Sequence, residues 1–171
     1  IFAAKRRPAF DPLIVHVATP DDWPRVASAM PPQALALARR FWPGPLTLVL
    51  PKLRAIPDIV TSGLPTVGIR VPDHALMRAV LERAGCPVAA PSANRFGRLS
   101  PTRAAHVVEQ LGDDIDLVLD GGPCAVGVES TIVRPDADGV TVLRLGGLPV
   151  EQIEAVAGPV RIAAHESPTA P

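Results

Sequence analysis

Residues 89–101 read Ala-Ala-Pro-Ser-Ala-Asn-Arg-Phe-Gly-Arg-Leu-Ser-Pro, and this segment carries the strongest indication of the fold class. It follows a short apolar run and precedes a helical pattern, so small polar side chains stand where a strand ends. Ligands of open α/β sheets bind at such edges. Ser92 and Asn94 offer donors and acceptors there, and Ser100 with Pro101 predicts a helix N-cap and first helical residue. The free amides of that helix start would favour an anion.

A second polar cluster lies near the N-terminus. Lys5, Arg6 and Arg7 are followed by Pro8 and then by an apolar run that ends at His16. Residues two apart on an extended segment point to the same side, so Lys5 and Arg7 could together bind a polyanion. Arginine offers phosphate oxygens a planar fork, and lysine offers a compact charge. The alternative is a solvated basic patch without a ligand.

Composition indicates a single globular domain. The chain has 171 residues, of which 47% are hydrophobic and 20% charged. No apolar run is long enough for a membrane span and no secretory signal pattern is visible, so we expect a cytoplasmic protein without a membrane partner. Basic and acidic residues balance at 17 each, which argues against broad nucleic-acid binding. Two cysteines without paired Cys/His spacing predict neither a disulfide framework nor a zinc site.

Apolar runs alternate with helical patterns along the chain, which predicts an α/β architecture. We expect strands at residues 13–17, 46–50, 65–71, 88–90 and 115–119, and an antiparallel pair at 126–133 and 140–145 around a turn at 135–139. We expect helices that begin near residue 19 and that span residues 32–41, 73–85, 100–112 and 149–157. The fold class is therefore an open, twisted, mixed sheet flanked by helices. Residues 1–160 would form the domain, and residues 161–171 a linker or tail.

Eight short motifs follow one another between residues 2 and 148. They are KRRP at 5–8, PLIVH at 12–16, FWPGPLT at 41–47, TVGIRVP at 66–72, APSAN at 90–94, DGG at 120–122, EST at 129–131 and LR at 143–144. In these motifs the chain resembles the YrdC-like threonylcarbamoyl-AMP synthase family. The resemblance implies a YrdC-like (DHBP synthase-like) α/β domain. Because the family's opening segment is missing and the tail resembles the linker of longer members, we expect a fragment of a two-domain protein.

The resemblance also implies a function. The family's reaction is that of an L-threonylcarbamoyladenylate synthase, a nucleotidyltransferase that forms threonylcarbamoyl-AMP and pyrophosphate from L-threonine, bicarbonate and ATP. The product serves threonylcarbamoyladenosine modification of tRNA, so a transient contact with tRNA or with a tRNA-modification complex is expected. ATP would be a substrate, with Mg²⁺ bridging its phosphates. Such adenylyl transfer depends on positioning and charge neutralisation more than on covalent chemistry.

Two other functions are compatible with parts of the sequence. The first is the related carbamoyl-adenylate-forming module of hydrogenase maturation, although that protein carries zinc-finger elements and no Cys-x-x-Cys occurs here. The second is a non-catalytic RNA-binding domain, which the low aromatic content of 4% disfavours because bases stack on aromatic side chains.

The family pattern assigns roles to individual residues of this chain, and no residue is assigned to a metal. The catalytic group comprises Lys5, Arg7, Ser92 and Asn94. The ATP contacts are Arg7, Asp11, Thr66, Ser92, Ser100 and Arg144. The L-threonine contacts are His16, Arg70, Ala90 and Ser130. The residues themselves agree in one respect: Thr66, Gly68 and Arg70 share one face of a predicted strand, where a guanidinium could bind a carboxylate and the glycine leaves room.

Several of these residues also have a structural interpretation. Arg70 and Arg144 could be surface arginines at a sheet edge, and His16 a satisfied strand-end histidine. Asp11 departs from the family, which usually carries Asn there as an ATP contact. A carboxylate would repel a triphosphate unless Mg²⁺ or a lysine intervenes, so Asp11 has either lost this role or contacts the ribose or the metal. Cys124 has no evident base beside it that would make it a nucleophile.

Overall fold

A seven-stranded mixed sheet organises the computed structural model of the chain, which describes residues 1–136 and 139–163. The order across the sheet is β4-β1-β3-β2-β5-β6-β7. The strands are β1 Ile14–His16, β2 Leu46–Pro51, β3 Thr66–Arg70, β4 Val88–Ala89, β5 Thr131–Asp136, β6 Gly139–Arg144 and β7 Val160–Ile162. Three neighbouring pairs are parallel (β1–β3, β2–β5 and β6–β7) and three are antiparallel, among them the predicted pair β5–β6. The predicted open, mixed α/β sheet is confirmed.

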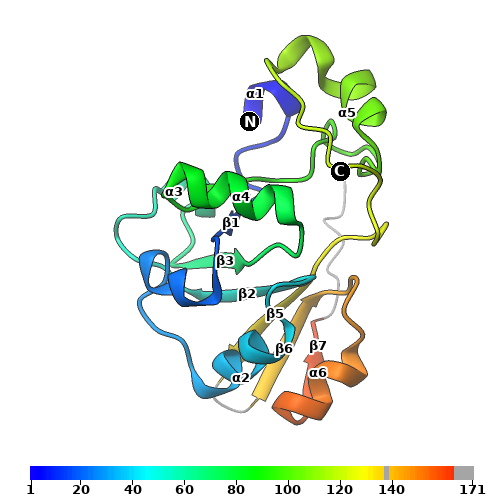
Figure 1. The fold of residues 1–171 in the computed structure, drawn as a ribbon. Helices are drawn as coiled ribbons and strands as arrows, with labels where there is room; N and C mark the ends of the chain where they lie inside the picture. Colours follow the sequence, from blue (N-terminus) through cyan, green and yellow to red (C-terminus); the bar gives the residue numbers. More distant parts are fainter. Residues whose placement is uncertain (137–138, 164–171) are drawn as a thin grey trace, which may run out of the picture.

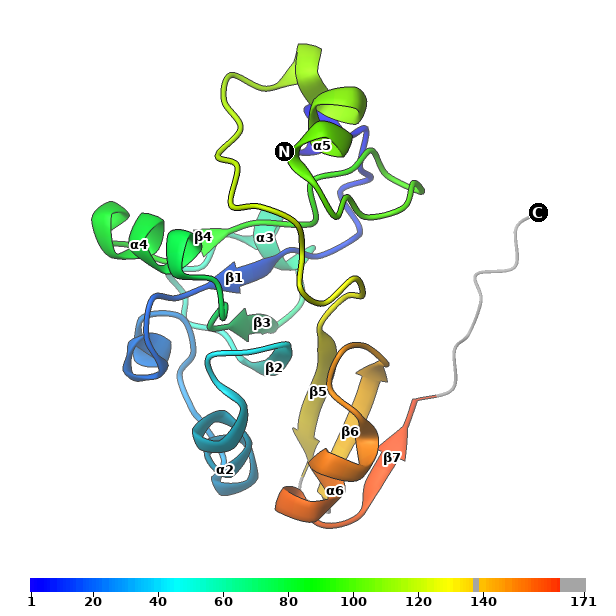
Figure 2. The same ribbon diagram turned by 45° about the vertical axis from the view of Figure 1, so that its right-hand side comes forward.

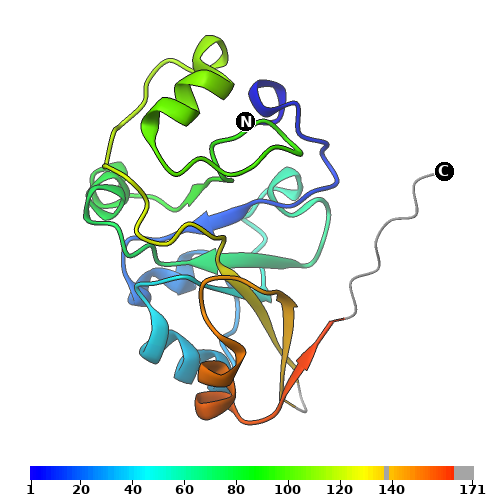
Figure 3. The ribbon, with the colours of Figure 1, turned by 90° about the vertical axis from the view of Figure 1, so that its right-hand side faces the viewer.

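Helices lie at both ends of the molecule and beside its sheet. They are α1 Phe2–Lys5, α2 Pro32–Phe41, α3 Asp58–Thr61, α4 Ala75–Ala84, α5 Ala104–Leu111 and α6 Val150–Ala157, with 3₁₀ helices at Pro20–Arg25 and Gly112–Asp114. Figures 1 and 2 show α2 and α6 together at one end, and α1 and α5 together at the other. Figure 3 shows the strands between these two groups. Within the described ranges, none of the helices combines the length and the hydropathy that a membrane span requires.

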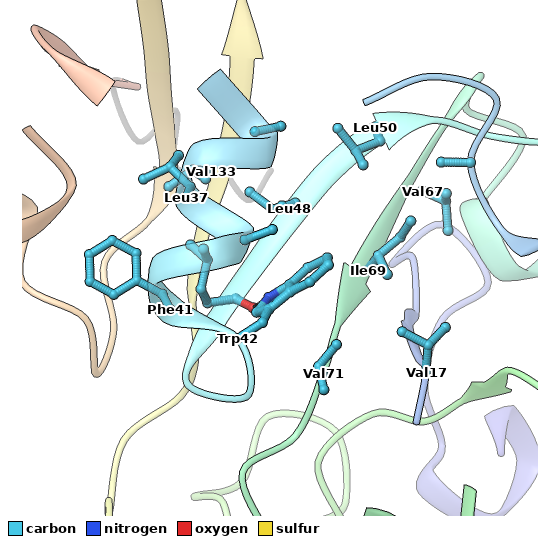
Figure 4. Packing of buried hydrophobic residues seen from close by; sticks show 14 of the residues in the cluster. Val17, Leu37, Phe41, Trp42, Leu48, Leu50, Val67, Ile69, Val71 and Val133 are labelled. Atoms are coloured by element: carbon cyan, nitrogen blue, oxygen red, sulfur yellow. Dashed lines mark hydrogen bonds between the residues drawn. The ribbon is translucent and has the colours of Figure 1, made fainter. Parts of the chain in front are cut away.

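The apolar core lies on the side of the sheet that α2 covers. Leu46, Leu48 and Leu50 of β2 are fully buried, and so are alternate residues of β3. Figure 4 shows the Trp42 side chain, just after α2, pointing toward Ile69 of β3. Each fully buried leucine contributes about 2 kcal/mol relative to an exposed one. The core therefore packs against one face of the sheet, and side chains of the opposite face are available to form a site.

The opposite face of the same strands is mixed, because it carries Thr47 and Arg70 but also Val49. Side chains alternate along a strand, so Thr47 of β2 and both Gly68 and Arg70 of β3 point away from the core. His16 of β1 is the partner of Arg70 in the parallel pair, which brings it to the same face. A Cβ at Gly68 would lie 3.3 Å from Thr47 Cγ2, so the glycine allows Thr47 to sit close. The proposed threonine contacts His16 and Arg70 thus share one side of the sheet.

Two predicted helix starts are wrong. The helix expected from Ser100 begins at Ala104, with Arg103 at its N-cap. Ser100 instead donates its hydroxyl to the Glu129 carboxylate, a partner far away in the chain. Similarly, His74 rather than Asp73 occupies the N-cap of α4. The Ser100 hydroxyl, which the local sequence pattern predicts as a helix cap, is instead bonded to an acceptor far away in the chain.

Some strand boundaries also differ from expectation. Residues 115–119 form no strand, and Leu117 and Leu119 are exposed at 75% and 58%. Residues 115–119 pair with none of the strands in the described sheet, although its edge strands β4 and β7 each have one unpaired side, so the apolar run by itself does not predict a strand. The strand expected at 126–133 begins at Thr131. The short elements α1, α3 and β7 were not expected.

Two expectations fall partly outside the described residues. Strand β7 runs to Ile162, past the expected end of the domain at residue 160, and pairs with β6. Residues 164–171 of the expected tail, and residues 137 and 138 of the expected turn, lie outside the part of the chain that the structure describes.

Candidate functional site

The two polar segments singled out in the sequence meet in space. Lys5 lies at the end of α1 and is 5% exposed. Its Nζ donates to the backbone carbonyl oxygens of Ser92 and Asn94, and lies 3.5 Å from Asn94 Oδ1. Phe96 N donates to Lys5 O at 2.8 Å. The spatial convergence that the sequence led us to expect is therefore confirmed.

The Lys5 ammonium group retains some capacity for a ligand. Burial lowers the pKa of Lys5, as does the nearby charge of Arg7, whereas the carboxylates of Glu129 and Asp11 act in the opposite direction. An ammonium group has three N–H donors. Two of these are directed to backbone carbonyl oxygens, and the third has only the long contact to the Asn94 side chain. Lys5 therefore both holds residues 92–94 in place and keeps one donor that an anion could use.

Arg7 is bound by its own loop. Its Nη2 lies 2.8 Å from Asp11 Oδ2 and 2.9 Å from Pro12 O, and its Nε lies 3.2 Å from Asp11 O. Asp11, the departure from the family pattern, is therefore paired with Arg7. The expectation of an extended basic segment was wrong, because α1 is helical and Arg6 has φ 52°. Arg7 nevertheless lies close enough to Lys5 to influence its charge.

The imidazole ring of His16 lies beside the charged guanidinium group of Arg70. His16 is 9% exposed, and its Nδ1 has no hydrogen-bond partner among the described residues. Burial, with the adjacent charge of Arg70, lowers the pKa of His16 to about 4, so the ring is neutral at pH 7. Arg70 Nε donates to Gly44 O at 2.9 Å, which orients the guanidinium, and burial and Arg144 lower its pKa. A carboxylate on this face would compensate the cation, and the histidine offers a further polar contact.

Ser130 belongs to a chain of polar contacts that crosses three strands. Its Oγ lies 2.8 Å from Thr47 Oγ1 and accepts from Arg144 Nη2 at 3.1 Å. Arg144 also donates to Ser130 O from Nε at 3.1 Å and from Nη2 at 2.9 Å. Arg144 Nη1 pairs with Glu129 Oε2 at 2.9 Å, and the other carboxylate oxygen accepts from Ser100 Oγ at 2.6 Å. Proposed threonine and nucleotide contacts are thus part of one network.

A close backbone contact fixes the segment that carries Glu129 and Ser130. Gly147 N donates to Glu129 O at 2.8 Å. A Cβ at Gly146 would lie 2.4 Å from Glu129 O and 2.5 Å from Ser130 C. These distances are too short for non-bonded atoms, so the two backbones can pass this closely only because residue 146 is a glycine.

A cavity of about 1280 Å³ lies beside this network. It is lined by residues of the 95–102 segment, α5 and the segments 127–129 and 144–146. Ser100, Glu129 and Arg144 are among its lining residues, and its volume exceeds that of an ordinary small-molecule site. A second cavity of about 250 Å³ is lined by Ser92 and Ser100, among others. Ser100 therefore borders both cavities.

Some predicted site residues take no part in the hydrogen-bond network around Ser130 and Arg144. Thr66 lies at the opposite end of β3 from Arg70, which is roughly 13 Å along a strand. In the described ranges no hydrogen bond of the Thr66 side chain links it to the other proposed nucleotide contacts. Ala90 N is already used, because it donates to Ile14 O at 3.0 Å. Cys124 Sγ lies 3.8 Å from Pro101 O, with no base in contact within the described chain.

Sequence reasoning missed two residues of the network, Thr47 and Glu129. Both stand inside quoted motifs, but neither was given a role. Thr47 could have been found, because it is the one polar residue in the apolar run at 46–50. Side chains alternate along a strand, so its side chain lies on the face opposite to Leu46 and Leu48. Glu129 carries no such signal, since its partners are 15 and 29 residues away.

Comparison with known proteins agrees with the motifs and the fold. The sequence profile of Sua5/YciO/YrdC, described as "Telomere recombination", matches residues 1–146. The chain belongs to the Sua5/YciO/YrdC family. Two Sua5/YciO/YrdC relatives named threonylcarbamoyl-AMP synthase are each 48% identical to it and cover 95% of it. They come from Pyrococcus abyssi, with 162 residues aligned, and from Bacillus subtilis, with 163.

The fold of this Sua5/YciO/YrdC chain also matches a solved structure. The crystal structure of P. abyssi Sua5 complexed with L-threonine superposes with a TM-score of 0.92 at 47% identity, over 95% of this chain and 48% of the other. The chain covers 48% of the P. abyssi synthase and 47% of the B. subtilis synthase, so it spans about half the length of the curated relatives it matches.

Proposed function

We propose that this chain carries the substrate site of an L-threonylcarbamoyladenylate synthase, which forms threonylcarbamoyl-AMP and pyrophosphate from L-threonine, bicarbonate and ATP. The names of the relatives at 48% identity and the L-threonine complex of P. abyssi Sua5 support the proposal. The single observation that carries it is the contact of buried Lys5 with Ser92 and Asn94, because it assembles the cationic and polar segments at one place. The product would serve threonylcarbamoyladenosine modification of tRNA, with tRNA or a modification complex as a transient partner.

L-threonine would lie on the polar face of the sheet. Its carboxylate would pair with Arg70, whose Nε is held by Gly44 O. The neutral, unpartnered His16 Nδ1 and the Ser130 hydroxyl would contact its other polar groups, with the backbone of Ala90 beside them. This arrangement would place the carbamate, formed from the amino group and bicarbonate, towards the cationic segment.

ATP would extend from the same point into the larger cavity. Lys5, Arg7 and Asn94 would neutralise the phosphates with Ser92, while the remaining nucleotide contacts would be Asp11, Thr66, Ser100 and Arg144. The carbamate oxygen would attack the α-phosphorus, and the bond to the bridging oxygen would break, so that pyrophosphate leaves with the electron pair. The cations stabilise the charge that develops on that leaving group.

Mg²⁺ would enter with ATP as part of the substrate. Residues 1–136 and 139–163 contain no group of three His, Cys, Asp or Glu side chains placed to hold a metal ion. Asp11 and Glu129 are each paired with an arginine. The ligands of the ion would therefore come mainly from phosphate oxygens and water, as Mg²⁺ commonly binds in nucleotide sites.

Pyrophosphate release tests this proposal. With L-threonine, bicarbonate and MgATP, the unsubstituted chain should release pyrophosphate, and Lys5→Ala should reduce the rate by at least about 10²-fold because a preorganised charge is lost. Lys52→Ala is the matched control: Lys52 is also mostly shielded, but it pairs with Asp58 at 2.5 Å, outside the site. Near-normal turnover in Lys5→Ala would reject the assignment. Turnover that requires carbamoyl phosphate in place of threonine and bicarbonate would indicate a carbamoyl-adenylate enzyme, and tight ATP-independent binding of tRNA would indicate an RNA-binding domain.

A further inference from the structure

Glu129 has no part in the proposed substrate contacts, yet both of its carboxylate oxygens are engaged at the site. Oε1 accepts from Ser100 Oγ at 2.6 Å, and Oε2 pairs with Arg144 Nη1 at 2.9 Å. The backbone of Glu129 is held as well, because Gly147 N donates to its carbonyl oxygen. Glu129 is thus restrained at both its side chain and its backbone, although its side chain is 42% exposed.

The two partners of Glu129 belong to different halves of the site. Ser100 stands in the segment 91–101, which Lys5 ties down through the carbonyl oxygens of Ser92 and Asn94. Arg144 ends β6 and holds both the backbone carbonyl and the hydroxyl of Ser130. Under the proposed function, Ser100 and Arg144 both contact the nucleotide, and Arg144 also reaches the threonine pocket through Ser130. Glu129 is the side chain that joins them.

The charge of Glu129 reaches the same cations. Its carboxylate favours the protonated forms of Lys5 and Arg70, besides its direct pair with Arg144. Burial disfavours both charges, as does repulsion by Arg7 for Lys5 and by Arg144 for Arg70, so a nearby anion offsets part of that cost before any ligand arrives.

We propose that Glu129 is a positioning residue that couples nucleotide binding to threonine binding by holding Ser100 and Arg144 at one fixed separation. The inference rests on the proposed function. A nucleotide that orders Ser100 would fix Glu129, hence Arg144 and the orientation of the Ser130 hydroxyl. Such coupling is reciprocal, so threonine would strengthen nucleotide binding by the same factor.

Two substitutions separate the effect of the length of the Glu129 side chain from the effect of its charge. Glu129→Gln keeps the reach: its amide oxygen can accept from Arg144 and its amide nitrogen can donate to Ser100 Oγ. Glu129→Asp keeps the charge but is one methylene shorter, so it cannot contact both partners. Positioning therefore predicts that Gln preserves more of the coupling than Asp, whereas a purely electrostatic role predicts the reverse order.

Calorimetric titration of threonine, with and without a non-hydrolysable ATP analogue, measures the coupling. The unsubstituted chain should bind threonine at least about 5-fold more tightly with the analogue. Glu129→Ala and Glu129→Asp should lose most of that gain, while threonine affinity without the analogue changes by less than about 3-fold. Glu129→Gln should keep an intermediate gain. The control is Glu151→Ala, which should keep the full gain, because Glu151 is an exposed carboxylate in the first turn of α6 that lines neither cavity and makes no ion pair in the described chain.

The possible failures are distinguishable. Lack of threonine binding by the unsubstituted chain in the presence of the analogue would contradict the proposed function itself. Threonine binding without coupling in the unsubstituted chain, or full coupling in Glu129→Ala or Glu129→Asp, would overturn only the role of Glu129. Should Glu129→Ala not fold, as judged by its thermal unfolding, the comparison of Gln with Asp decides alone: a coupling in Asp equal to or above that in Gln would overturn the proposal.

Discussion

Strands β2 and β3 present opposite chemistry on their two faces. On one face, Leu46, Leu48 and Leu50 are fully buried under α2. On the other, Thr47 meets Ser130, and Arg70 stands beside His16. One pair of strands therefore contributes to both the core and the proposed site, and alternate residues of each strand belong to one or the other.

The two faces are stabilised by different physics. Apolar contacts on the core face are non-directional, so each side chain needs only to fill its space. The polar face depends on directed hydrogen bonds, and a buried polar atom without a partner costs about 1–3 kcal/mol. His16 Nδ1 is such an atom within the described residues. An unsatisfied group of this kind is consistent with a face that is completed by a ligand.

The largest effect should come from the core face. Leu48→Ala should lower the free energy of unfolding by about 2–5 kcal/mol, because it leaves a cavity under α2. Its KM for threonine, measured well below the melting temperature, should stay within about twofold of the unsubstituted value. The matched variant is Thr47→Val on the adjacent position, which should lower stability by only about 1 kcal/mol but raise that KM. Urea denaturation and steady-state kinetics of both variants check this, and a reversed pattern would show that the faces are not separate.

An intermediate effect should appear in the acid stability of the polar face. His16 has a folded pKa of about 4, below its ordinary value of 6.5, so the unfolded chain binds a proton first as the pH falls. Stability should therefore decline between pH 6.5 and pH 4, by up to about 3 kcal/mol from this group, with no further contribution below that window.

The measurement is the urea midpoint between pH 7 and pH 4 for the chain and for His16→Gln. The urea midpoint of the variant should change less with pH in this window, because the variant lacks the buried imidazole whose protonation the folded state disfavours. Identical pH profiles would mean that the buried ring does not resist protonation.

The smallest effect should come from Asp11, at the rim of the site. Asp11→Asn removes the carboxylate that pairs with Arg7 and restores the amide usual in the family. The freed guanidinium should lower the KM for ATP by about 3- to 10-fold, with a change in stability below about 1 kcal/mol. Asp58→Asn, which opens the exposed pair with Lys52, is the control and should leave this KM unchanged. A higher KM in Asp11→Asn would show that the carboxylate itself contributes to nucleotide binding.

Local signals explain which elements could be predicted. Helix α2 was predicted with both of its bounds, since a proline opens it and the Pro-Gly-Pro turn ends it. The alternation in β3 placed Gly68 and Arg70 on one face, as observed. Residues 115–119 were assigned wrongly, because an apolar run does not reveal whether a strand is free to pair with it.

The site could be predicted only in part. Lys5, Ser92 and Asn94 were expected to converge on the strength of the family motifs, and they do. Glu129 was not found, because nothing in its neighbourhood indicates that it reaches Ser100, 29 residues earlier.

The sequence alone determined the alternation of core and polar residues in β2 and β3, the bounds of α2, and the family. These depend on residues within a few positions of one another, whose spacing fixes which side of a strand or helix they occupy. Only the tertiary structure decided which donor meets which acceptor: Lys5 with the carbonyl oxygens near Ser92, and Glu129 with both Ser100 and Arg144. A side-chain hydrogen bond forms with whatever the folding of distant segments brings within about 3 Å, and local propensities contain no record of that encounter.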